Sequence, residues 1–262
     1  MKALIKIQFR SILTTYNIIF GLLISFVLGI LQAFRLNHEL IIINEQGTIA
    51  DFLLFSLGGW QEPMTLLSTI QWLMLILIVL LISQWTYIIS SSWMVMVITR
   101  FKTRIFWWFS NCVAQLLICT VILAVLIIGH LIAGYIFFNW DLKWGIYTLN
   151  QQILIGDIKP VQLFFIGFFI LLTGMYSLIL IQMIVKTIFH AGKASMILFI
   201  ILIILGFSYI YQQITYLLSP IFYPSIIVSV QNGVENALFI NIGLCILLSI
   251  IGLFVIRIRS IL

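Results

Sequence analysis

The stretch that decides the fold is WFSNCVAQLLICTVILAVLIIGHLIAGYIFF, residues 108–138, which contains no Asp, Glu, Lys or Arg. A transmembrane helix needs about 20 consecutive apolar residues, so this run is long enough to cross a bilayer. Six such runs can be recognised, at about 17–34, 67–97, 108–138, 161–185, 194–217 and 237–256. The sequence therefore predicts an all-α membrane protein with six transmembrane helices.

The overall composition supports the same fold class. The chain is 63% hydrophobic and 8% charged, with a mean hydropathy of +1.25, whereas soluble domains carry about 25% charged residues. Six spans and their loops occupy most of the 262 residues, so we expect a single transmembrane domain over 1–262. The net charge of +6 is spread over small groups at span ends. It therefore favours anionic lipid headgroups as the partner, and not nucleic acid.

The charges divide between the two sides of this topology. With a cytoplasmic N-terminus, every acidic residue falls outside: Glu39, Glu45, Asp51, Glu62, Asp141, Asp157 and Glu235. Most basic residues fall inside: Lys2, Lys6, Arg10, Arg100, Lys102, Arg104, Lys186, Lys193, Arg257 and Arg259. Only Arg35, Lys143 and Lys159 lie outside. This positive-inside asymmetry predicts that both termini are cytoplasmic.

The N-terminal residues 2–15 have an amphipathic pattern. Lys2, Lys6 and Arg10 recur every four residues and so share one helical face. We expect an amphipathic helix in the inner membrane interface, with its cations toward the headgroups. The alternative is a frayed basic tail.

The membrane-depth residues limit the chemistry. Ion- and proton-coupled transporters keep ionisable groups at this depth, and here only His130 qualifies, either as a hydrogen-bonding residue or as a proton relay. No H-E-x-x-H or G-x-S-x-G motif occurs, and the Gly-Lys at 192–193 lacks the rest of a Walker motif. We therefore expect no catalytic residue, metal ligand or cofactor on this chain.

Four uncharged residues on the second and third spans are candidates for a substrate path. Asn111 and Gln115 lie one turn apart on one face, where such groups either bond to neighbouring helices or line a path. Trp85 and Tyr87 lie deeper than the aromatic residues of the interface. They are expected either to pack or to face an amphipathic cargo.

Two external segments contain apolar sequence. The first, about 35–66, holds the apolar stretch 52–57 and is expected to rest on the outer membrane surface. The second contains Pro220 and Pro224, which prevent a continuous helix. It continues with apolar 226–230, which predicts an external or re-entrant helical pair before the last span.

The second and third spans are unusually long. At 1.5 Å per residue a 30-residue helix measures about 45 Å, against a hydrocarbon core of about 30 Å. Both excess lengths meet at the basic, aromatic sequence 99–108. The sequence therefore predicts a cytoplasmic hairpin at this turn.

This layout resembles the permease subunit of a type-2 ATP-binding-cassette (ABC) exporter, over the whole chain. The size and the absence of a fused ATPase are similar to small Gram-positive permeases that export phenol-soluble modulins or expel lantibiotics. The resemblance implies a multi-pass protein of the plasma membrane that pairs with a second permease subunit. It also implies that ATP and Mg are bound by a separate ABC ATPase subunit.

In that family the turn between the second and third spans docks on the ATPase. The matching residues here are Arg100, Phe101, Lys102, Thr103 and Arg104, with Lys186 and Lys193 in a lesser contact. We therefore expect an exporter of amphipathic or antimicrobial peptides that is not an enzyme by itself. The alternatives are an ABC permease for a lipid, polysaccharide or drug, a membrane-embedded enzyme, and a non-transporting membrane scaffold.

Overall fold

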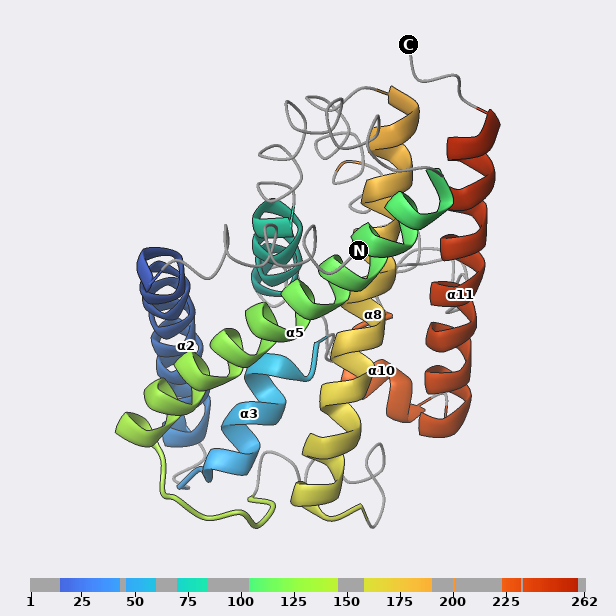
Figure 1. The fold of residues 1–262 in the computed structure, drawn as a ribbon. Coiled ribbons are helices and arrows are strands. Elements are labelled where there is room, and N and C mark those ends of the chain that lie inside the picture. Colours follow the sequence, from blue (N-terminus) through green and yellow to red (C-terminus); the bar gives the residue numbers. More distant parts are fainter. Residues whose placement is uncertain are drawn as a thin grey trace.

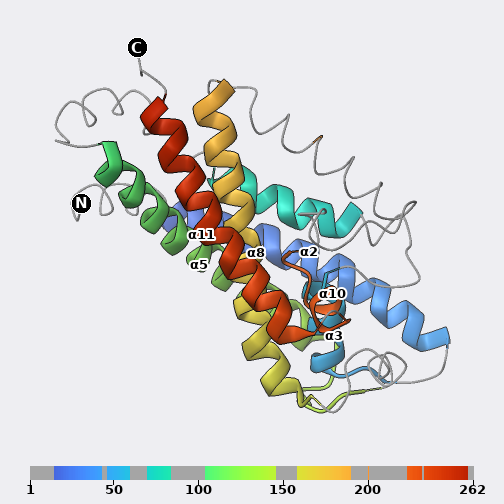
Figure 2. The same ribbon diagram turned by 90° about the vertical axis from the view of Figure 1, so that its right-hand side faces the viewer.

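The computed structural model describes residues 15–42, 46–59, 70–83, 104–145, 158–189, 200, 223–231 and 233–258 (Figures 1 and 2). Their helices are α2 (Thr15–Ile42), α3 (Ile49–Leu57), an unlabelled helix at Ile70–Ser83, α5 (Arg104–Phe137), α8 (Pro160–Phe189), α10 (Ile226–Gln231) and α11 (Val234–Ile258). α5 contacts α2, α3, α8 and α11, and α8 packs along α11.

Four helices are long and apolar enough to cross a membrane: Ile18–Ile42, Ile105–Phe137, Pro160–Ile188 and Val234–Ile258. They coincide with the first, third, fourth and sixth predicted spans and indicate a membrane protein. The second predicted span contributes the shorter apolar helix Ile70–Ser83. The rest of that span, nearly all of the fifth and the proposed interfacial helix at 2–15 lie outside the described residues.

α2 continues two turns beyond its predicted end at residue 34. The extension is stabilised by Arg35, whose Nε donates to Glu39 at 3.2 Å and whose Nη1 donates to Gln71 at 3.1 Å. The Arg35 guanidinium also lies 5.2 Å from the Phe55 ring centroid. The helix therefore continues past Arg35, which ends the apolar run in the sequence, because the Arg35 side chain forms hydrogen bonds with Glu39 and Gln71.

α2 and α5 pack closely through small residues. Gly21, Ser25, Gly29 and Ala33 recur every four residues along α2. Gly129 and Ala133 have the same spacing on α5. A Cβ atom at Gly29 would lie 2.8 Å from the Ala133 Cβ, and one at Gly129 would overlap the Ser25 side chain. Small residues at this spacing allow membrane helices to approach one another closely.

The short helix α3 is buried in one end of the bundle and does not rest on the membrane surface as expected. All nine of its residues are buried. Thr48 caps it by accepting a hydrogen bond from the Asp51 backbone N–H at 3.2 Å, and the Ile49 N–H donates to the Asn139 carbonyl at 3.1 Å. These bonds attach α3 to the loop that follows α5.

α10 lies beside α3 at this end. The Ile227 N–H donates to the Gly58 carbonyl at 3.0 Å, and the Ser225 hydroxyl donates to the same carbonyl at 3.1 Å. Asn241 of α11 donates to the Tyr223 carbonyl at 2.9 Å. α10 fits the helical element predicted before the last span. The proline-containing residues 219–222 lie outside the described part of the chain.

Charged residues lie at both ends of the bundle. α3 and the first turns of α8 and α11 lie at one end, here called the α3 end, and the last turns of α8 and α11 lie at the other (Figure 1). Lys159 and Glu235 fall at the α3 end, whereas Lys186 and Arg257 fall at the opposite end. The assignment of the α3 end to the outside remains a prediction.

Candidate functional site

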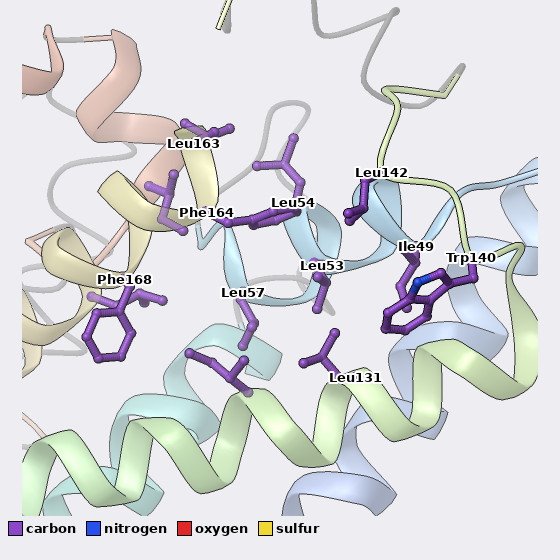
Figure 3. A pocket seen from close by; sticks show the side chains of 13 residues that line it. Ile49, Leu53, Leu54, Leu57, Leu131, Trp140, Leu142, Leu163, Phe164 and Phe168 are labelled. Carbon is purple, nitrogen blue, oxygen red and sulfur yellow. The ribbon is translucent and has the colours of Figure 1, made fainter. Parts of the chain in front are cut away.

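The candidate site is an apolar cavity of about 300 Å³ at the α3 end. It lies between α3, α5, α8 and the loop after α5 (Figure 3). Thirteen residues line it: Ile49, Leu53, Leu54, Leu57, Ile127, Leu131, Trp140, Leu142, Leu163, Phe164, Phe168, Leu171 and Ile226. All are apolar apart from the indole nitrogen of Trp140, so this is a hydrocarbon-lined space inside a membrane protein.

Helical periodicity explains how α3 and α8 build two walls of the cavity. Ile49, Leu53 and Leu57 are four residues apart and share one face of α3. Phe164 and Phe168 share one face of α8 in the same way and approach α3 from the other side (Figure 3). The large side chains keep the helix backbones apart, and a space is left between them.

Polar contacts outside the cavity hold its wall in place. The Thr48 hydroxyl donates to the Lys143 carbonyl at 3.0 Å, and the Gly145 N–H donates to Asp51 Oδ1 at 3.1 Å. The Trp144 indole N–H donates to the Ile158 carbonyl at 2.8 Å. The loop after α5 is thereby fixed to α3 at one side and to the start of α8 at the other.

The cavity lining has chemical consequences. Ligand pockets of about 300–1,000 Å³ usually combine apolar walls with a few polar groups that orient the ligand. Here, among the residues that the structure describes, Trp140 supplies the one hydrogen-bonding side chain of the lining. Burial of a polar group without a hydrogen-bond partner is costly, so the site suits a ligand segment made of hydrocarbon. None of the thirteen described lining residues has a side chain for acid–base or nucleophilic chemistry.

Two of the predicted path residues lie elsewhere, inside the bundle. Asn111 and Gln115 are both 1% exposed. Asn111 donates to the Trp107 carbonyl at 3.1 Å, and Gln115 accepts from the Ser83 hydroxyl at 3.2 Å. Gln115 therefore bonds between helices, as the packing alternative predicts. Trp85 and Tyr87 lie outside the described residues, and a role of any of the four in a substrate path stays a prediction.

The predicted ATPase contacts are described only in part. Arg100, Phe101, Lys102, Thr103 and Lys193 lie outside the described residues. Arg104 is the first residue of α5. Lys186 is in the last turn of α8 and is 4% exposed, so its side chain packs within this chain. Contact of these residues with an ATPase remains a prediction.

His130 forms a polar contact between α2 and α5. Its Nδ1 lies 3.0 Å from the Ser25 hydroxyl and 2.8 Å from the Leu126 carbonyl, and Ser25 also donates to that carbonyl at 2.6 Å. This agrees with the expectation of a hydrogen-bonding histidine. The four-residue spacing of small residues on α2 is a signal from which this contact could have been found in the sequence.

Neither a metal site nor a known relative assigns a function. Among the described residues, no group of three or more His, Cys, Asp or Glu is placed to hold a metal ion. Comparison with known proteins gives no match to a protein family, a characterised protein or a solved structure. The functional argument therefore depends on the chain's own residues and geometry.

Proposed function

We propose that the chain is the permease subunit of an ATP-driven exporter whose ATPase is a separate polypeptide. The observation that carries the proposal is the position of charge in the four described spans. Arg35 and Glu39 lie in the last two turns of α2, Lys186 in the last turn of α8, and Glu235 and Arg257 at the ends of α11. The middle of these four spans thus lacks the charged groups that ion-coupled transporters use. The energy for transport would come from outside the chain.

The length of α5 supports a place where that energy is received. Its apolar part, Ile105–Phe137, has 33 residues and measures about 50 Å at 1.5 Å per residue. Even when tilted, such a helix can extend beyond a hydrocarbon core of about 30 Å. α5 begins at Arg104, the last residue of the basic, aromatic sequence 100–104, and a projecting hairpin there would contact an ATPase.

The proposed cargo is an amphipathic or antimicrobial peptide, carried across the plasma membrane of a Gram-positive bacterium by two paired permease subunits. A cargo with an apolar face needs a pathway of apolar and uncharged polar side chains, without a fixed set of charged partners. The apolar interior of the described bundle is compatible with this requirement.

The experiment is co-purification of the chain with the products of adjacent genes, followed by ATP hydrolysis measurements in lipid nanodiscs. We expect a Walker-motif ATPase to co-elute and amphipathic peptides to stimulate it. Replacing Arg100, Lys102 and Arg104 with Glu should abolish complex formation. The new carboxylates would lie against acidic residues of the ATPase, and like charges that face each other at an interface cost several kcal/mol.

The matched control replaces Arg257 and Arg259 with Glu, which changes basic residues on the same predicted side but away from the hairpin. Both variants are first checked for membrane insertion and topology. An ATPase that binds the triple variant as well as the unmodified chain would contradict the docking role. Absence of any co-eluting ATPase would contradict the permease proposal itself.

A further inference from the structure

We propose that the cavity binds one acyl chain of an anionic membrane lipid, whose phosphate lies near Lys143 and Lys159. The proposal is independent of the exporter function, because it rests on the cavity and its rim alone. It assigns a resident lipid to the pocket that α3, α5, α8, Ile226 of α10 and the loop after α5 line.

The lining selects hydrocarbon over peptide. An inserted peptide segment would bring backbone N–H and C=O groups that need hydrogen-bond partners, and of the described lining side chains only Trp140 offers one. An acyl chain has no such groups along its length. It therefore fills the space without leaving a polar atom unsatisfied.

The depth of the cavity in the membrane brings lipid acyl chains close to it. An empty space deprives its lining atoms of dispersion contacts, and an apolar cavity does not hold water well. Lining residues Ile127 and Leu171 lie ten and eleven residues from the α3-end termini of α5 and α8, or about 15 Å along each helix. The cavity therefore lies at depths reached by the acyl chains of one leaflet, given a core about 30 Å thick.

The charges at the rim favour an anionic headgroup. Lys143 directly follows the lining residue Leu142, and Lys159 lies one turn before the lining residue Leu163. Both lysines are exposed, and neither forms a salt bridge with a described carboxylate. The neighbouring Asp141 accepts the Lys143 backbone N–H at 3.2 Å. Two of the three basic residues predicted on this side thus lie close in sequence to lining residues.

The test is photolabelling of the full chain in phosphatidylcholine vesicles. The probe is phosphatidylglycerol with a diazirine on one acyl chain, and a matched phosphatidylcholine probe measures headgroup preference. Labelled peptides are identified by mass spectrometry. We expect the anionic probe to label α3 and the Phe164–Phe168 segment above the level of the lipid-facing residues of α11.

Two variants occlude the cavity and one serves as control. Ile127→Trp places an indole inside the cavity, whereas Ile128→Trp places it at a neighbouring position that is 48% exposed. Leu142→Trp blocks the rim of the cavity. Because residue 142 lies in a loop, this variant provides the labelling measurement if Ile127→Trp does not fold. We expect Ile127→Trp and Leu142→Trp to reduce α3 labelling to the lipid-facing background, and Ile128→Trp to preserve it.

A separate variant tests whether the two lysines bind an anionic headgroup. Lys143→Gln combined with Lys159→Gln should raise the probe fraction needed for half-maximal labelling about thirty-fold, which corresponds to about 1 kcal/mol for each lysine. Arg257→Gln, at the opposite end of the bundle, should leave it unchanged. Undiminished α3 labelling in both occluding variants would overturn the acyl-chain site. Equal labelling by the two probes would overturn the anionic headgroup, and labelling of α3 by a photoreactive amphipathic peptide in place of the lipid would show a different occupant.

Discussion

The two faces of α5 differ in how closely neighbouring helices approach. Toward α2, Gly129 and Ala133 meet Ser25 and Gly29 with no room for a further methyl group. Toward α3 and α8, Ile127 and Leu131 border a cavity of about 300 Å³. Both faces lie in one apolar helix, so hydrophobicity does not account for the difference. Side-chain size does, because small residues every four positions form a flat contact surface, whereas large residues on three helices leave a space between them.

The largest expected effect comes from disrupting the close contact. Gly129→Leu would force a large side chain against Ser25 and the Phe26 backbone, and overpacking of this kind costs about 2–3 kcal/mol. We expect a clear loss of thermal stability in detergent, measured by scanning fluorimetry. Gly243→Leu is the matched control, because no described residue lies within 4 Å of a Cβ atom at Gly243. Equal destabilisation by both changes would mean that the α2–α5 contact is not sterically limited.

The sequence determines much of this close contact and little of the cavity. Long apolar runs identify four of the described helices by length alone, and the spacing of Gly21, Ser25, Gly29 and Ala33 marks the contact face. The burial of α3 has no such signal. Thr48 forms a hydrogen bond with Lys143, and Asp51 forms one with Gly145, more than 90 residues away in each case. No local sequence pattern predicts contacts between residues so far apart in the chain.

The composition of the cavity lining is a further reason why the sequence does not predict the cavity. The candidates for a substrate path, such as Asn111 and Gln115, are polar or aromatic, and polar groups are uncommon within the apolar runs of a membrane protein. Apart from Trp140, the described lining of the cavity consists of leucine, isoleucine and phenylalanine, which are common in every apolar run of the chain. Only the three-dimensional arrangement distinguishes a leucine beside a void from one in a packed core.

An intermediate effect is expected where α3 is attached to the loop after α5. Thr48→Ala removes the cap on the Asp51 N–H and the bond to the Lys143 carbonyl, and the loss of a cap costs about 1 kcal/mol. We expect faster hydrogen exchange at residues 49–52 and 139–145, measured by mass spectrometry. Thr120→Ala is the control, because Thr120 donates only to the Leu116 carbonyl of its own helix. Exchange that stays unchanged in the Thr48 variant would show that other contacts fix this wall.

The smallest effect is expected inside the cavity. Leu131→Phe adds volume on the side of α5 that has space for it, and we expect a gain in stability of about 0.5 kcal/mol, the lower end of the range for filling a cavity. Ile132→Phe, at the next residue and 50% exposed, should change nothing. The size of the Leu131 effect depends on what occupies the space. In delipidated detergent the added ring replaces a void and should raise the melting temperature by a few degrees. In vesicles with anionic lipid it competes with the acyl chain, and the gain should disappear. A gain of equal size in both media would mean that the cavity is empty in the membrane, and a loss of stability in delipidated detergent would mean that its walls are as tightly packed as the α2 face.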